Sequence, residues 1–141
     1  MKRSAFTWIE LIFVIVVLGI LAATAVAKLG GMSERAKEAQ LKAFAGTLNR
    51  TSGGGFWFRS INDNRNGSVA YSDYDDLIDQ YIELIPGYTT GPSLINCNAA
   101  GTGVFLRYPY SKTYEIHCRD GNSEESPFFR LYNVDEGIYL D

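Results

Sequence analysis

Hydrophobic residues are concentrated at the start of the chain. Residues 11–27 form an apolar run without a charged side chain, and Glu10 stands immediately before it. About 20 apolar residues span the hydrocarbon core of a bilayer, so the run predicts a membrane-crossing helix. Residues 33–48 then combine charged positions with two neighbouring apolar stripes, which is typical of an amphipathic helix. One helix over residues 6–49 would be roughly 65 Å long.

Glycines interrupt this helical segment at Gly19, Gly30 and Gly31. Each glycine costs about 1 kcal/mol of helix propensity relative to alanine. We therefore predict that any bend or melted turn lies at Gly19 or at the Gly30 and Gly31 pair. Two helices hinged at that pair are the alternative to a single helix. Residues 51–55, with three consecutive glycines, predict the end of the helical segment.

The remainder of the chain has the pattern of a small soluble domain. The apolar stretch 56–58 is predicted to lie in its core, and residues 71–84 are predicted to form a short acidic helix that ends before Pro86. Four strands with turn residues between them are predicted at 104–108, 113–118, 128–134 and 138–140. The pattern therefore predicts an α+β fold, in which a long N-terminal transmembrane helix carries a head with a small antiparallel β-sheet.

Composition and motifs exclude several function classes. The 141 residues carry 13 Lys and Arg against 16 Asp and Glu, a formal net charge of −3. No basic stretch indicates a nucleic-acid-binding surface. The sequence contains no phosphate-binding loop, zinc-ligand spacing, nucleophile elbow or catalytic carboxylate pair, so we do not expect an enzyme.

The two cysteines, Cys97 and Cys118, lie in the predicted head. If the head is exported, the oxidising compartment favours one disulfide between them. Closing a loop of about 20 residues contributes on the order of 3 kcal/mol to stability. Two free thiols in a cytosolic protein are the alternative.

Glu10 is the unusual feature of the apolar N-terminus, because an unpaired carboxylate in a bilayer costs on the order of several kcal/mol. A cleaved secretory signal, with Lys2 and Arg3 as its basic region, would place this charge where apolar residues are required. A plain anchor that keeps Lys2 and Arg3 in the cytoplasm leaves the carboxylate without a role.

Residues 2–11 resemble the processing site of type IV prepilins and type II secretion pseudopilins. A basic leader ends in the small residue Ala5, Phe6 follows, and Glu10 stands four residues further on, before the apolar run. The family usually has Gly at the position of Ala5. The resemblance implies cleavage between Ala5 and Phe6, N-methylation of Phe6, and pairing of Glu10 with the Phe6 amine of a neighbouring subunit. Such a pair is stronger in low dielectric than at a surface and fixes the packing register.

The resemblance also implies a domain organisation. Residues 1–5 would be a leader peptide, residues 6–50 a transmembrane and assembly helix, and residues 51–141 a periplasmic or extracellular head. The chain would cross the bacterial inner membrane once, with its N-terminus in the cytoplasm, and then enter a pilus or pseudopilus.

The expected partners are other copies of the chain, related pilins or pseudopilins, the prepilin peptidase and the inner-membrane assembly platform, with no nucleic acid. Pilin and pseudopilin both remain open, and the short head favours a pseudopilin or a small pilin. A membrane-tethered or secreted small binding domain that does not polymerise is the alternative function.

Two polar loops in the head are candidates for weak calcium binding, and no other cofactor is expected. In the first loop, oxygen-bearing side chains follow the spacing of a calcium loop at Asn62, Asn64, Asn66 and Asp73. An ordinary Asx-rich turn is the alternative. The second candidate is the acidic loop 120–125, which calcium would occupy as in some pseudopilin heads. His117, the only histidine, is predicted to be an exposed strand residue rather than a catalytic or metal-binding one.

Overall fold

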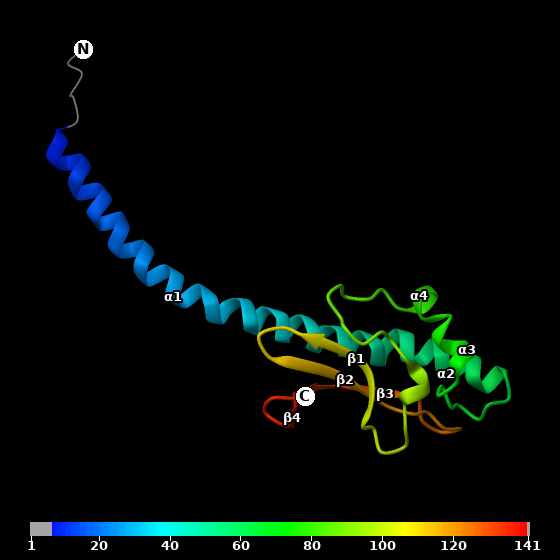
Figure 1. Cartoon of the computed structure of the whole chain (residues 1–141). Helices are drawn as coiled ribbons and strands as arrows, with labels where there is room; N and C mark the ends of the chain where they lie inside the picture. The colour runs from blue at the N-terminus through cyan, green and yellow to red at the C-terminus, as the bar shows by residue number, and fades with distance from the viewer. Residues whose placement is uncertain (1–6, 141) are drawn as a thin grey trace, which may run out of the picture. The chain divides into compact units, whose positions relative to one another are not determined.

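The computed structural model describes residues 7–140 and has an α+β, pilin-like layout: a long N-terminal helix followed by a four-stranded antiparallel sheet (Figure 1). The predicted fold class is confirmed. The chain divides into two compact units, Met1–Lys37 and Glu38–Asp141. The second unit includes the end of the long helix, because Leu41 is fully buried in the core of the head. The division into an assembly helix at 6–50 and a head at 51–141, which the resemblance implies, remains a prediction.

Helix α1, Trp8–Thr47, is 40 residues long and continuous. It passes through Gly19, Gly30 and Gly31, and a Cβ added at any of these would meet no atom within 4 Å. The alternative of two helices hinged at Gly30 and Gly31 is therefore wrong for this structure. Good helix formers on both sides outweigh the glycine cost. A bend at these glycines in an assembled filament stays a prediction.

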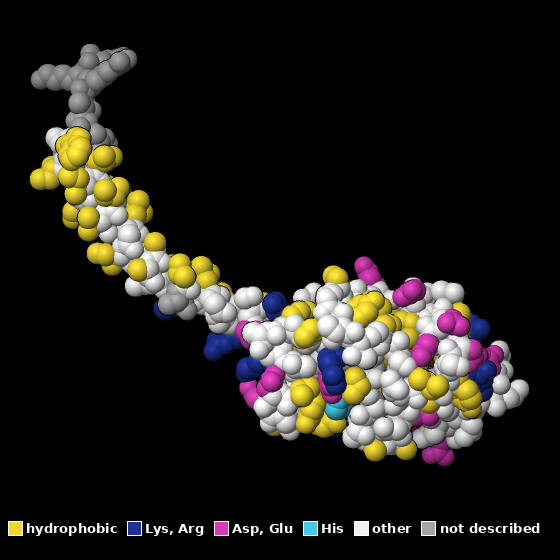
Figure 2. All heavy atoms as spheres, viewed as in Figure 1, with side chains coloured by type: hydrophobic (Ala, Val, Ile, Leu, Met, Phe, Trp, Pro, Cys, Tyr) yellow, Lys and Arg dark blue, Asp and Glu magenta, His cyan; other side chains and the backbone are white. Residues whose placement is uncertain are grey.

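The first unit exposes its large apolar side chains, and Figure 2 shows them along the segment. Trp8 is 80% exposed and Phe13 is 68% exposed. Among the described residues, one helix is long and apolar enough to cross a membrane, and it begins at Trp8. An apolar helix without a polar face needs a non-aqueous environment, so its length and composition fit a bilayer.

The helical segment does not end at residues 51–55, and that prediction is wrong. A π-helical turn, η1 at Leu48–Ser52, leads directly into helix α2 at Gly53–Asn62. Gly53 is buried, and a Cβ there would lie 3.3 Å from the ring of Phe129. Glycine is needed here for close packing against the sheet rather than for helix termination.

Only part of the stretch 56–58 lies in the core. Phe56 is fully buried and its ring centroid lies 4.7 Å from that of Tyr81. Phe58 is 69% exposed, so its predicted burial is wrong. The stretch belongs to α2, and consecutive helical side chains point in directions about 100° apart, so three in a row cannot share one face.

The predicted acidic helix at 71–84 is also wrong. The segment forms two separate turns, α3 at Ser72–Asp75 and α4 at Ile78–Tyr81. The carboxylate of Asp75 accepts a hydrogen bond from the backbone N–H of Leu94, which ties the end of the first turn to a distant loop. Aspartates are poor helix formers, so this contact readily interrupts the helix.

The four predicted strands are present and form a meander. The sheet order is β1-β2-β3-β4, and neighbouring strands are antiparallel. The strands are β1 at Gly103–Pro109, β2 at Thr113–Arg119, β3 at Phe128–Asn133 and β4 at Ile138–Tyr139. One face of the sheet packs with the end of α1 into a single core, which includes Leu41, Phe44, Leu48, Phe105, Leu106, Tyr114, Ile116, Phe129 and Leu131.

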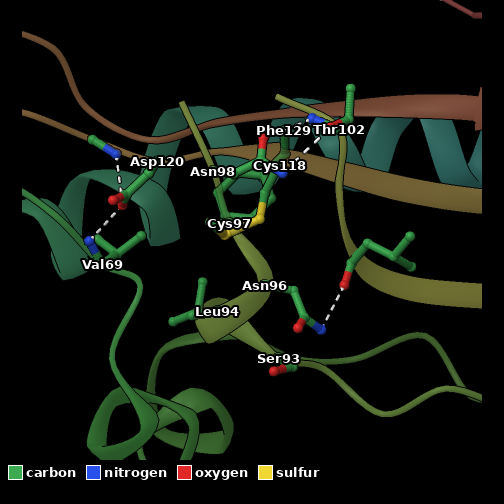
Figure 3. The surroundings of a disulfide bond; sticks show 12 residues. Val69, Ser93, Leu94, Asn96, Cys97, Asn98, Thr102, Cys118, Asp120 and Phe129 are labelled. Carbon is green, nitrogen blue, oxygen red and sulfur yellow. Dashed lines mark hydrogen bonds between the residues drawn. A yellow bond between two sulfur atoms is a disulfide. The ribbon is translucent and has the colours of Figure 1, made fainter. Parts of the chain in front are cut away.

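A disulfide between Cys97 and Cys118 joins the loop before β1 to β2 (Figure 3), which confirms the predicted pairing. The Cα atoms are 5.0 Å apart. The chain approaches itself closely here, since a Cβ at Gly103 would lie 1.7 Å from the carbonyl oxygen of Asn96. The side chain of Asn96 donates a hydrogen bond to the Val104 carbonyl. The disulfide therefore lies in a tightly packed part of the head.

Candidate functional site

Glu10 lies in the first turn of α1 and already has a partner within the subunit. The backbone N–H and the hydroxyl of Thr7 both donate to Glu10 Oε2, each at 2.9 Å. A Glu three residues after a Thr that precedes the helix is the capping-box arrangement, which satisfies a free N–H at the helix start. The Thr-x-x-Glu spacing indicates this capping contact in the sequence, but Glu10 was predicted only to pair with a neighbouring subunit.

The surroundings of the Glu10 carboxylate are apolar. Ile9, Phe13 and Val14 line a shallow groove beside it. Within residues 7–140, the hydrogen bonds to the carboxylate all go to Oε2. Thr7 is neutral, so the capping interaction orients the carboxylate and leaves its charge uncompensated. A cation placed against Oε1 would complete the site electrostatically.

The predicted processing residues lie outside the described part of the chain. Ala5 and Phe6, on either side of the expected cleavage point, both fall in residues 1–6. Cleavage between them, methylation of Phe6 and its contact with Glu10 therefore remain predictions.

Asp73, a predicted calcium ligand, is paired with an arginine. Arg65 donates from Nη1 to Oδ1 at 2.7 Å and from Nη2 to Oδ2 at 2.8 Å. This hydrogen bonding holds the pKa of the Asp73 carboxyl below its ordinary value. The guanidinium also lies over the rings of Tyr71 and Tyr74, at 4.2 and 4.8 Å from their centroids. The chain itself therefore supplies a cation to Asp73.

The three asparagines of the first calcium candidate belong to a tight turn. Asn62 ends α2, and Asn64 and Asn66 have φ angles of 57° and 56°. Asparagine tolerates this left-handed conformation better than most residues, which fits the Asx-rich turn that was the alternative. Among the residues that the structure describes, no three His, Cys, Asp or Glu side chains are grouped as a metal site.

The second candidate, loop 120–125, uses its carboxylate to hold the first loop. Asp120 accepts hydrogen bonds from the Ser68 hydroxyl at 2.6 Å and from the Val69 N–H at 2.7 Å. Asn122 accepts hydrogen bonds from the backbone N–H groups of Glu124 and Glu125. The hydrogen bonds of Asp120 therefore join the second loop to the first, and those of Asn122 lie within the second loop.

His117 is buried, so its predicted exposure is wrong. Its Nε2 lies 2.8 Å from Glu115 Oε2, and its Nδ1 lies 3.0 Å from the hydroxyl of Tyr139. The imidazole stacks on the ring of Tyr132, with centroids 4.7 Å apart. Strand alternation did place His117 away from the helix side, but Tyr132 of β3 and Tyr139 of β4 pack against its ring.

Glu115 receives a further contact from Arg107, whose Nε donates to Oε1 at 2.7 Å. Burial raises the pKa of the Glu115 carboxyl, but the hydrogen bonds from His117 and Arg107 outweigh burial and leave the pKa below its ordinary value. The cluster connects β1, β2 and β4 through polar contacts. Since β4 pairs with β3 over only two residues, we infer that the cluster serves to hold β4 in place.

Comparison of the chain with protein-family models, with curated proteins and with solved structures found no match.

Proposed function

We propose that this protein is a structural subunit of a type IV filament, either a type IV pilin or a type II secretion pseudopilin. The observation that carries the proposal is Glu10, a carboxylate in the first turn of an exposed apolar helix. A side chain at this position that only capped its helix could be Gln, which makes the same contact without placing a charge in the bilayer. A negative charge at this position has a role when a cation forms an ion pair with it.

The cation that we propose is the α-amine of Phe6 in a neighbouring subunit, released by cleavage after Ala5. Thr7 orients the carboxylate through Oε2, so the amine approaches Oε1. The pair neutralises both charges in an apolar environment and fixes the axial position of one helix against the next. Methylation of the amine leaves its positive charge in place.

The exposed apolar helix has two successive environments under this proposal. Before assembly, the bilayer surrounds it; in the filament, the helices of neighbouring subunits do. Both environments are apolar, so assembly from the bilayer gains van der Waals packing between helices rather than removal of these side chains from water. Trp8, Ile9 and Phe13 are each more than two-thirds exposed in the isolated subunit. Packing between helices therefore provides the affinity between subunits, and the ion pair of Glu10 fixes the axial position of one helix against the next.

The head fits a location outside the cytoplasm. A disulfide such as Cys97–Cys118 persists in oxidising compartments. We propose that the N-terminus starts in the cytoplasm of a bacterial cell, that the helix crosses the inner membrane once, and that the head lies in the periplasm before assembly. A prepilin peptidase and an inner-membrane assembly platform are then the required partners.

The experiment that tests this function changes Glu10 and measures filament yield. Glu10→Ala should abolish assembly while the chain still inserts into the membrane, and Glu10→Gln should do the same, because it keeps hydrogen bonding but loses the charge. Glu34→Ala, an acidic substitution further along α1, is the matched control and should leave the yield unchanged. Unchanged filament yield from the Glu10 variants would contradict this role of Glu10, and an unaltered chain that forms no filaments would favour a tethered binding module instead.

A further inference from the structure

Two basic side chains follow the apolar part of α1. Residues 8–27, with Glu10 as their only charged side chain, extend over about 30 Å, which is the thickness of the hydrocarbon core of a bilayer. Trp8 stands at one end of this stretch, and Lys28 directly follows the other. Arg35 lies seven residues further along α1, about 10 Å away along the helix axis. Figure 2 shows basic side chains near this end of the apolar stretch.

Lys28 and Arg35 lie on one face of α1, because seven residues are close to two helical turns. Both residues are exposed, and within residues 7–140 neither side chain has an ion pair or a hydrogen bond. The carboxylate of Glu38, about one turn beyond Arg35, is already in an ion pair. Glu34 directly precedes Arg35, but consecutive helical side chains point about 100° apart. The positive charges of Lys28 and Arg35 are therefore available to an external anion.

The surroundings of the two cations match the boundary between hydrocarbon and headgroups. Leu29 is 60% exposed and Met32 is 63% exposed, so apolar and basic side chains alternate here. The headgroup region adds about 5–7 Å on each side of the hydrocarbon core. Each Cα–Cβ bond in a helix tilts toward the helix N-terminus, so the side chains of Lys28 and Arg35 lean back toward the apolar stretch. Long basic side chains near the ends of such a stretch place their charges at the membrane interface, which brings the Arg35 guanidinium to the headgroup level.

We propose that Lys28 and Arg35 bind phosphate groups of anionic phospholipids in the leaflet at this end of the apolar stretch. The ammonium of Lys28 is a compact charge, and the planar guanidinium of Arg35 donates two parallel hydrogen bonds to phosphate oxygens. A zwitterionic headgroup already carries a cation beside its phosphate, so these side chains favour lipids with a net negative charge. The proposal rests on the proposed membrane crossing of α1 and identifies the lipids that contact the helix before assembly.

Fluorescence quenching in vesicles measures this lipid preference. The full chain carries a fluorescent label on Met32→Cys, at a level between the two basic residues, and the vesicles consist mainly of phosphatidylcholine. A small fraction of either phosphatidylglycerol or phosphatidylcholine carries a nitroxide quencher. A basic residue near an anionic surface changes the affinity about fivefold, so phosphatidylglycerol should associate with the labelled site about fivefold more strongly than phosphatidylcholine.

Neutralising both cations should remove the preference. Lys28→Gln with Arg35→Gln in the labelled chain should lower the association of phosphatidylglycerol about fivefold, to that of phosphatidylcholine. Lys37→Gln is the matched control, because it removes the same charge two residues after Arg35, on nearly the opposite side of α1. Lys37 already has an interaction within the chain, so this control should keep the preference.

Two results would overturn the lipid contact and leave the filament function standing. One is equal association of both lipids with the labelled chain, and the other is the same loss of preference in Lys37→Gln as in the double variant. Flotation of the vesicles in alkaline carbonate shows separately whether the chain is inserted in the bilayer. A chain that carbonate removes from the vesicles would overturn both the membrane crossing and the lipid contact.

Discussion

The side chain of Asn49 forms hydrogen bonds with the backbone of strand β3 at the edge of the sheet. It lies in η1, the π-helical turn, and its Nδ2 donates to the Phe129 carbonyl at 2.8 Å. Its Oδ1 accepts from the Phe129 N–H at 2.7 Å. Strand β4 pairs with β3 only at Tyr132 and Asn133, so Phe129 has no β4 partner. The amide of Asn49 takes the place of a strand there.

Replacing Asn49 by Ala removes both hydrogen bonds and leaves an N–H and a carbonyl group of β3 without these partners. A net hydrogen bond contributes about 0.5–1.5 kcal/mol, and an unsatisfied buried group costs about 1–3 kcal/mol. The site is half-buried, so water partly replaces the lost bonds. We therefore expect Asn49→Ala to lower the free energy of unfolding of the head by about 2 kcal/mol.

Denaturant titration of the full chain in detergent, followed by near-ultraviolet circular dichroism of the head tyrosines, measures this change. Asn49→Asp is the more specific variant, because its carboxylate accepts from the Phe129 N–H but faces the Phe129 carbonyl without a proton to donate. It should destabilise at least as much as Asn49→Ala. Asn62→Ala, at the end of α2, is the control and should change stability by less than about 0.5 kcal/mol. Equal stability of Asn49→Ala and the control would refute the role of Asn49.

Two further predictions concern the sheet. The free energy of unfolding should fall as the pH drops below about 4.5, the ordinary pKa of a Glu carboxyl, because the depressed pKa of Glu115 makes the folded state hold its proton less tightly than the unfolded state. Glu115→Gln should reduce the change of the unfolding free energy with pH in this range, measured by urea titration at each pH. The same pH dependence as in the unaltered chain would contradict the prediction. Replacing Cys97 and Cys118 together by Ser should lower stability by about 3 kcal/mol, a loss that thermal unfolding would report. Chemical reduction of the disulfide in the unaltered chain should lower the stability by a similar amount. Unchanged stability after reduction would contradict the prediction.

The parts of the fold that the sequence predicted correctly have strong local patterns. The apolar run 11–27 lies within α1, and its length and composition are those of a helix that could cross a membrane. The second strand alternates between apolar and polar residues, and turn residues such as Gly121 and Gly137 separate the four strands, whose ends were predicted to within one residue. The fold class follows from these elements alone.

The wrong predictions involve residues whose role depends on distant parts of the chain. Gly53 follows the pattern of a helix end, but its lack of a side chain serves the approach of Phe129. Asp75 lies in a plausible helix, yet its hydrogen bond to Leu94 breaks it. His117 alternates like an exposed strand residue, and the positions of Tyr132 and Tyr139 show that it is covered.

The candidate site was predicted in part. Glu10 was identified from its charge in an apolar segment, which is a local feature. Its hydrogen bonds with Thr7 follow from spacing and could also have been predicted. The pairing of Asp73 with Arg65 could not, because a calcium-like spacing does not show which carboxylate a neighbouring guanidinium will reach.

Pairing of Glu10 with the Phe6 amine requires cleavage after Ala5, and the mass of the mature N-terminal peptide shows whether that cleavage occurs. The chain is isolated from bacterial cells that contain a prepilin peptidase, digested, and examined by mass spectrometry. We expect a peptide that begins at Phe6 and carries one N-methyl group. A peptide that begins at Met1, or one that begins near Lys28, would contradict it.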